Sequence, residues 1–348
     1  MTTRLSWLEA PLRDALGMAR HHHALLIHGP AGVGQFELAL LLAQAWLCSA
    51  GTQRPCGACA DCRLVEARTH PDLRVLIPAA LRESLGWDSD EGDNAASADT
   101  KGSRTKPSKD IRIDAVRAAI AFAQLTSARG RGKVLVLYPA ERLNAVAANA
   151  LLKTLEEPPG DARFVLATGA PQALPATVRS RCQPLHLPAP PTASAAAWLR
   201  EQGVDTPDLP LAVAGGQPLE ALAAWREGAT AQALERLPRA VRAGDTNALA
   251  GWSLPRAIDA LHKLCHDEMA LTVGAPARYF VSLTSAPRAS LPALQAWARA
   301  LARAARHAEH PWQAPLMIES LVLQGQRACA GADTEAAVSG RRSVHSPP

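Results

Sequence analysis

The sequence lacks a run of about 18 apolar residues, the minimum for a helix that crosses a bilayer. Residues 1–16 mix charged with apolar side chains and do not have the uninterrupted apolar stretch of a signal peptide. We therefore expect a cytoplasmic protein without a membrane partner. In a reducing compartment the seven cysteines are expected to be free or metal-bound, which excludes a disulfide framework.

A strong excess of charge is missing as well. The net charge of +5 is compatible with a nucleic-acid partner but does not indicate one, since Arg341 and Arg342 in a polar tail contribute to it. At 348 residues the chain is longer than an ordinary domain, and its 48% hydrophobic content is enough for packed cores. We expect two or three domains.

Strands and helices alternate in residues 1–188. Strand patterns occur at 23–28, 73–77, 134–137 and 163–167. Helical patterns occur at 4–20, 35–47, 111–125 and 143–156. This alternation predicts an α/β domain with a parallel sheet covered by helices on both faces. Residues 79–110 have no apolar periodicity and predict a disordered insertion.

The sequence changes after residue 188 to Ala- and Leu-rich helical segments with little strand propensity. We expect two all-α domains, at 189–245 and 246–328. The polar, small residues at 329–348 predict a disordered tail.

A glycine-rich turn follows the first strand and leads into an apolar helix, as in phosphate-binding α/β units. A working phosphate loop reads GxxxxGK followed by Ser or Thr; its lysine neutralises phosphate and its hydroxyl binds Mg²⁺. Here Gly29 and Gly34 have the required spacing, but Gln35 replaces the lysine and Phe36 the hydroxyl. A chance glycine turn in an unrelated α/β protein is the alternative.

The acidic half of such a site is missing too. In P-loop ATPases a later apolar strand ends in acidic residues that organise Mg²⁺ and activate water. The matching strand at 134–137 is followed by Tyr138 and Pro139. Because four groups are missing from two distant segments, we expect no ATP hydrolysis and no ATP as a cofactor.

Four of the seven cysteines fall within residues 48–62, at Cys48, Cys56, Cys59 and Cys62. Four thiolates satisfy the tetrahedral preference of zinc and leave no position for water or substrate. This spacing predicts a structural Zn²⁺ site. The alternatives are free core cysteines and a redox-active CxxC pair.

Three segments resemble a known family. They are the helix at 148–159, which ends Leu-Leu-Lys-Thr-Leu-Glu-Glu-Pro-Pro, the strand at 164–168, and residues 174–182, which read Leu-Pro-Ala-Thr-Val-Arg-Ser-Arg-Cys. Together with the four-cysteine insertion, they resemble the AAA+ subunits of the bacterial DNA polymerase III clamp loader. The likeness extends to residues 310–323. The insertion at 79–110 and the short first cysteine spacing depart from the family pattern.

This resemblance implies a RecA-like AAA+ domain followed by a helical lid and a helical collar. Within the family, the degenerate phosphate loop resembles the delta-prime type of subunit and not the gamma/tau type that hydrolyses ATP. Such a subunit would be a rigid stator in a five-subunit ring with gamma/tau and delta subunits. The ring would load the sliding clamp onto primed DNA in the nucleoid-associated replisome.

The resemblance also implies a role for Arg181. In the family, the arginine of the Ser180–Arg181–Cys182 motif projects into the ATP site of the neighbouring subunit, where its permanent charge can bind phosphate oxygens. The alternative is a surface arginine at a helix end, paired with a carboxylate. Thr168 matches the position that senses γ-phosphate in active relatives, and we expect it to be a relic.

Two other functions are the alternatives to a delta-prime stator. An active gamma/tau-type ATPase requires a lysine at 35, a hydroxyl at 36 and carboxylates at 138–139, all of which the sequence lacks. A zinc-containing nucleic-acid-binding protein requires a basic, aromatic zinc loop, whereas this loop holds only Arg54 and Arg63 and no aromatic residue.

Overall fold

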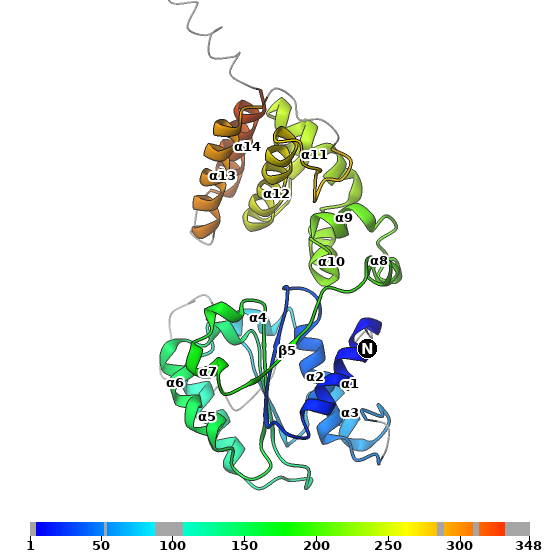
Figure 1. Cartoon of the computed structure of the whole chain (residues 1–348), viewed down its shortest axis with the longest axis vertical. Helices are drawn as coiled ribbons and strands as arrows, with labels where there is room; N and C mark the ends of the chain where they lie inside the picture. The colour runs from blue at the N-terminus through cyan, green and yellow to red at the C-terminus, as the bar shows by residue number, and fades with distance from the viewer. Residues whose placement is uncertain (1–4, 52–53, 88–106, 284–288, 309–312, 331–348) are drawn as a thin grey trace, which may run out of the picture. The chain divides into compact units, whose positions relative to one another are not determined.

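The computed structural model describes residues 5–51, 54–87, 107–283, 289–308 and 313–330 (Figure 1). The chain divides into two compact units, Met1–Ala189 and Pro190–Pro348. The first unit is α/β and the second is helical in its described part, which confirms the predicted fold class. Among the described residues, no helix has the length and hydrophobicity that crossing a membrane requires.

The first unit contains a five-stranded parallel sheet in the order β2-β3-β4-β1-β5. Its strands are β1 (Ala24–His28), β2 (Leu73–Leu76), β3 (Val134–Leu137), β4 (Arg163–Thr168) and β5 (Gln183–His186). Strand β3 is buried along its whole length, as expected for a central strand covered on both faces. The edge strand β5 has one buried residue, Leu185, which explains why the sequence pattern did not predict it.

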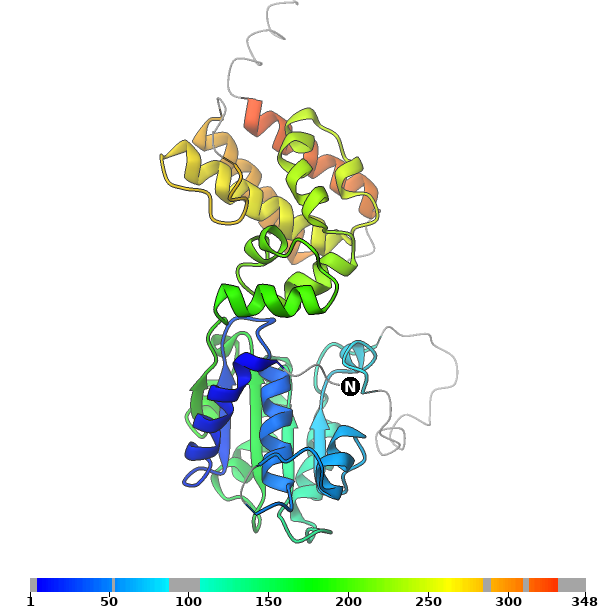
Figure 2. The ribbon, with the colours of Figure 1, turned by 90° about the vertical axis from the view of Figure 1, so that its right-hand side faces the viewer.

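Helices cover both faces of this sheet, as Figures 1 and 2 show. One layer holds α1 (Glu9–Met18), α2 (Gln35–Leu47) and α3 (Ala60–Glu66), and η1 (Ser6–Leu8) precedes α1. The other holds α5 (Ile113–Gln124), α6 (Ala145–Glu156) and α7 (Ala176–Arg179), with apolar side chains packed on the sheet. The short helices α4 (Ala79–Arg82), η3 (Ala140–Arg142) and η4 (Pro171–Ala173) lie in the connections.

The carboxyl ends of the parallel strands share one edge of the sheet, the usual place for a ligand site in such folds. The phosphate loop follows β1, Tyr138 follows β3, and Thr168 ends β4. Strand pairing thus brings together residues that are about 140 positions apart in the sequence, since His28 lies opposite Thr168 in the register.

The second unit consists of α8 (Thr192–Glu201), α9 (Asp208–Val213), α10 (Pro218–Arg226), α11 (Ala231–Ala243), η5 (Asn247–Leu249), α12 (Leu254–Thr272), α13 (Leu291–Arg306) and α14 (Ala314–Ala330). Helices α11 to α14 share one apolar core around the buried Trp297, whose indole donates to the Leu321 carbonyl at 2.9 Å. Gly325 lets α14 approach closely, because a Cβ there would lie 2.5 Å from the Trp297 ring. The domain boundary expected at 245 stays a prediction.

The structure corrects the predicted insertion at 79–110. Helix α4 begins at Ala79, and Trp87 is buried, because its ring packs edge-on against Phe36. Residues 88–106 lie outside the described residues, and so do residues 331–348 of the predicted tail. Cys329 and Ala330, by contrast, belong to α14, and Cys329 is buried in the core.

Candidate functional site

The phosphate loop has the backbone path that its glycines predict. Gly32 and Gly34 adopt positive φ values of 72° and 107°, and Gly34 is the N-cap of α2. A Cβ at Gly29 would collide with the carbonyl oxygen of Leu187, which follows β5. The loop therefore keeps the shape of a phosphate site although two of its chemical groups are replaced.

Gln35 turns back onto this loop. Its side chain is buried, and its amide nitrogen donates to the carbonyl oxygen of Gly29 at 3.0 Å and to that of Pro30. From the N-terminal side, the Trp7 indole donates to the Val33 carbonyl at 2.9 Å. The side chains of Gln35 and Trp7 thus donate hydrogen bonds to the backbone carbonyl groups of this loop.

An aromatic cluster occupies the place where Mg²⁺ ligands are expected. The Phe36 ring stacks on the Tyr138 ring with centroids 5.0 Å apart, and the Trp87 ring lies edge-on to Phe36 at 6.1 Å. The Arg68 guanidinium lies 4.9 Å above the Trp87 ring, a cation–π contact. Sequence analysis missed Trp87; its only signal was one large aromatic residue within a polar segment.

The hydroxyl of Thr168 is also engaged within the chain. Thr168 is fully buried, and its Oγ1 donates to the Glu141 carboxylate at 2.7 Å. The backbone N–H of Gly169 donates to the other carboxylate oxygen at 3.4 Å. Glu141 was not predicted as a site residue, because its approach to Thr168 depends on the pairing of β3 with β4.

The structure brings together all four predicted zinc ligands. The sulfur atoms of Cys48, Cys56, Cys59 and Cys62 lie within 4.8 Å of one another, with Cys48–Cys59 at 3.8 Å and Cys56–Cys62 at 3.9 Å. Sulfurs bound at about 2.3 Å to a tetrahedral zinc lie about 3.8 Å apart, so the cluster fits this ion. Cys48, whose spacing departed from the family pattern, fits as well as the others.

Local structure explains how the cluster forms. Cys48 follows α2, Cys59 is the N-cap of α3, and Cys62 lies in its first turn. Backbone N–H groups of Cys59 and Cys62 donate to the preceding sulfurs at 3.4 Å. A hydrogen bond from the Ser49 side chain, together with backbone bonds from Cys62 and Ser49, lowers the pKa of Cys59 to about 5, which favours a thiolate ligand.

Charged residues connect the cysteine cluster to the sheet. Asp61, which lies between Cys59 and Cys62 in the sequence, is buried. It pairs with the Arg129 guanidinium and, at 3.4 Å, with the His70 ring. His70 in turn accepts a hydrogen bond from the backbone N–H of Asp72 at 3.0 Å. The module therefore packs onto the α/β unit as a fixed part of its surface.

The Ser180–Arg181–Cys182 motif lies in the turn between α7 and β5, with Cys182 buried and the Arg181 side chain partly exposed. Cys182 is buried, and burial raises its pKa to about 12, so its thiol is unreactive. The Arg181 side chain is 30% exposed. Its Nε donates to Glu156 Oε1 at 2.6 Å, and its Nη1 donates to the Thr177 carbonyl at 2.8 Å. The ion pair with Glu156 is what the alternative, a surface arginine paired with a carboxylate, predicts. The role of Arg181 at a neighbouring ATP site therefore stays a prediction.

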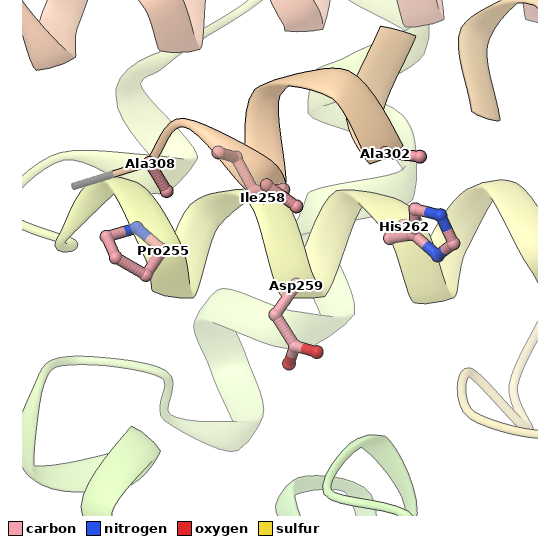
Figure 3. A pocket seen from close by; sticks show the side chains of 7 residues that line it. Pro255, Ile258, Asp259, His262, Ala302 and Ala308 are labelled. Carbon is pink, nitrogen blue, oxygen red and sulfur yellow. The ribbon is translucent and has the colours of Figure 1, made fainter. Parts of the chain in front are cut away.

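The second unit contains a hollow of about 380 Å³ between α12 and α13 (Figure 3). Pro255, Ile258, Asp259 and His262 line it from α12, and alanines line it from α13. The Asp259 carboxylate is paired with Lys263 at 2.6 Å. None of the predicted site residues lies in this hollow, and its walls are mostly apolar.

Comparison with known proteins identifies the family. A family model described as "DNA polymerase III, delta subunit" matches residues 8–191, more than half of the chain. DNA polymerase III subunit delta' of Pseudomonas aeruginosa is 38% identical over 62% of this chain and 59% of its own length, and that of Escherichia coli is 36% identical over 64% and 60%.

Subunit tau of Escherichia coli is 33% identical over 75% of this chain but only 35% of its own length. The match thus spans about 60% of the two delta' relatives and a smaller share of tau. The chain belongs to the DNA polymerase III delta-subunit family, with the delta-prime subunits of the clamp loader.

Proposed function

We propose that this chain is a delta-prime subunit that neither binds nor hydrolyses ATP and serves as a stator in the clamp loader. One observation carries the proposal: at the positions where a working site has its lysine, hydroxyl and acidic residue, Gln35 bonds back to the Gly29 carbonyl and the Phe36 ring stacks on Tyr138. The shape of an ATPase domain is kept while the groups that hold ATP are replaced.

The chemistry of the pocket supports this. A triphosphate requires a cation at the β/γ oxygens and oxygen ligands for Mg²⁺. The Gln35 amide carries no charge, and the aromatic cluster offers no carboxylate in their place. The Glu141 carboxylate accepts hydrogen bonds from Thr168 and Gly169. These contacts argue against the alternative of an active gamma/tau-type ATPase.

The proposed contribution of the chain to catalysis is Arg181, acting in trans. The guanidinium is partly exposed at a turn, and a permanently charged planar group can bind phosphate oxygens of an ATP held by a neighbouring subunit. Ser180 and Cys182 fix the turn: the Ser180 hydroxyl donates to the Thr177 carbonyl at 3.2 Å, and Cys182 is buried. The partners are then gamma/tau and delta subunits in a five-membered ring, and through it the sliding clamp and primed DNA.

The test uses the reconstituted clamp loader with Arg181→Ala. We expect normal assembly and a fall of about twofold or more in DNA-stimulated ATPase and clamp loading. Arginine fingers accelerate hydrolysis by about 10³–10⁵-fold, but this one serves a single ATP site of the complex. Arg179→Ala is the matched control, because Arg179 is an exposed arginine two residues earlier, at the end of α7. Rates unchanged by Arg181→Ala would refute the trans role.

We further propose one structural Zn²⁺ per chain, bound by Cys48, Cys56, Cys59 and Cys62. The fit of the sulfur distances supports this, and a closed four-thiolate site supplies stability and no reaction. Metal analysis of protein purified without chelators is expected to give one zinc per chain. The rival function, a zinc-containing nucleic-acid-binding protein, gains no support from the geometry, since the charged neighbours of the cluster pair within the chain.

A further inference from the structure

We propose that Glu156 is the positioning residue of Arg181, holding its guanidinium in the orientation in which it meets the ATP of the neighbouring subunit. The proposal rests on the proposed trans role of Arg181 and deepens it. It starts from an ion pair between two sequence motifs: Glu156 is the last residue of α6, and Arg181 lies 25 residues later in the turn after α7.

The contact fixes one edge of the guanidinium. Both Nε and Nη2 of Arg181 donate to the same oxygen, Oε1 of Glu156, the former at 2.6 Å. On the other side, Nη1 donates to the carbonyl oxygen of Thr177 at 2.8 Å and, more weakly, to the Ser180 hydroxyl at 3.4 Å. The planar group is therefore held from two elements, α6 and α7, and its rotation is restricted.

A count of donors shows what this arrangement leaves for a ligand. An arginine has five N–H groups. The Glu156 carboxylate takes one from Nε and one from Nη2, and the Thr177 carbonyl takes one from Nη1. One N–H of Nη2 remains, and the second N–H of Nη1 has only the weak contact to the Ser180 hydroxyl at 3.4 Å, so a phosphate can accept hydrogen bonds from both.

Restricting the side chain before the partner arrives has a kinetic benefit. A free arginine loses rotamer entropy when it binds, whereas one already held in position loses less. Correct placement of charge at the reacting phosphate acts on the chemical step itself. Glu156 should therefore raise the turnover of the neighbouring ATP site without changing how tightly that site binds ATP.

The pair contributes little to folding. The side chains of Arg181 and Glu156 are 30% and 47% exposed, and ion pairs that exposed add little to stability. Loss of Glu156 is thus expected to leave the chain folded and able to assemble. Any effect on the ATPase of the complex then reports on the orientation of Arg181.

The experiment compares four single variants and one double variant in the complete, reconstituted clamp loader: Glu156→Ala, Glu156→Gln, Glu157→Ala, Arg181→Ala, and Glu156→Ala with Arg181→Ala. The kcat and the KM for ATP of the DNA-stimulated ATPase are measured for each. Glu157 is the matched control because it is the next carboxylate along the chain and is exposed.

We expect Glu156→Ala to lower kcat by roughly 1.5-fold with KM unchanged, a smaller fall than that of Arg181→Ala, because the two contacting residues are coupled and Glu156 acts through the arginine. Glu156→Gln should recover part of the loss, because an amide oxygen still accepts a hydrogen bond. Glu157→Ala should match the wild type. The double variant should equal Arg181→Ala alone, because Glu156 acts only through the arginine.

The outcomes distinguish the positioning role of Glu156 from the trans role of Arg181, on which it rests. If Arg181→Ala changes nothing, the trans role itself fails. If Arg181→Ala lowers kcat but Glu156→Ala behaves like Glu157→Ala, Glu156 does not position the arginine. A rise in kcat on losing Glu156 would show that the carboxylate restrains Arg181 instead of orienting it, and a further fall in the double variant would show a separate role; either overturns the proposal.

Discussion

At the scale of single residues, the buried carboxylate of Asp72 organises the basic turn that precedes β3. Asp72 is fully buried just before β2 and accepts hydrogen bonds from the Ser127 hydroxyl and from the backbone N–H groups of Ala128 and Arg129. Lys133 Nζ completes the set at 2.8 Å. Burial alone would raise the pKa of this carboxyl, but the bonds from Lys133 and the turn outweigh it and lower the pKa to about 2.

This pKa predicts how stability depends on pH. Because the folded-state pKa lies below the ordinary value of 3.8, the carboxylate stabilises the fold above about pH 4, and this contribution is lost as the pH falls towards 2. Asp72→Asn should reduce the free energy of unfolding by about 2 kcal/mol at pH 7. Denaturant unfolding at pH 7 and near pH 2 checks this, with the exposed Asp110→Asn as control. A deficit that persists unchanged at pH 2 would contradict the electrostatic explanation.

At the scale of elements, periodicity predicted strands β1 to β4 and the longer helices α1, α2, α5 and α6 of the first unit, but not the short helices α3, α4 and α7. Helix α2 and strand β3 have the predicted bounds, and β1 and β4 differ by one residue at an end. The edge strand β5 was missed because its polar residues carry no apolar pattern, and it forms by pairing with β1. Local patterns cannot reveal a strand that owes its existence to a distant partner.

The features of the candidate site, like the elements, could be predicted from the sequence only in part. The loss of the lysine and of the acidic pair can be read from the sequence, because an absent side chain needs no geometry. What replaces them could not be predicted: Gln35 folding onto its own loop, Trp87 packing beside Phe36, and Glu141 reaching Thr168 all depend on tertiary contacts. The cysteine spacing was informative because its ligands are close in sequence.

The proposed zinc site lies in the loop at 48–62, and the stability of this loop is expected to depend on the metal. Its loop has few apolar side chains, and zinc binding is worth roughly 10–16 kcal/mol in small zinc peptides, so the metal should order this segment. Chelation, or Cys59→Ser, is expected to lower the melting temperature of the first unit and to expose residues 48–62 to protease. The readouts are calorimetry and limited proteolysis. Chelator should add nothing to Cys59→Ser, and a chelator effect of equal size in that variant would refute the four-cysteine site.

At the scale of the whole molecule, the proposed function separates the fold of an ATPase domain from the ability to hold ATP. The parallel sheet, the glycine loop and the buried Thr168 are present, while the side chains of Gln35, Phe36, Tyr138 and Glu141 make contacts within the chain. We propose that these contacts keep the pocket closed, so that its conformation does not change when nucleotide is added. That property suits a subunit whose contribution is a fixed shape and one arginine offered to a neighbour.

The last prediction tests that property in the isolated chain. A ligand at about 100 times its Kd stabilises a protein by about 2.7 kcal/mol, which a thermal melt detects readily. Millimolar Mg·ATP should therefore leave the melting temperature of this chain unchanged, whereas an active gamma/tau-type subunit should shift upward. Restoring Gln35→Lys and Phe36→Thr together should still give no ATPase, because the strand end at Tyr138 supplies no carboxylate for Mg²⁺ or water. Micromolar, Mg²⁺-dependent binding of ATP by the unmodified chain would mean that the aromatic cluster opens, and that this subunit takes part in the nucleotide cycle.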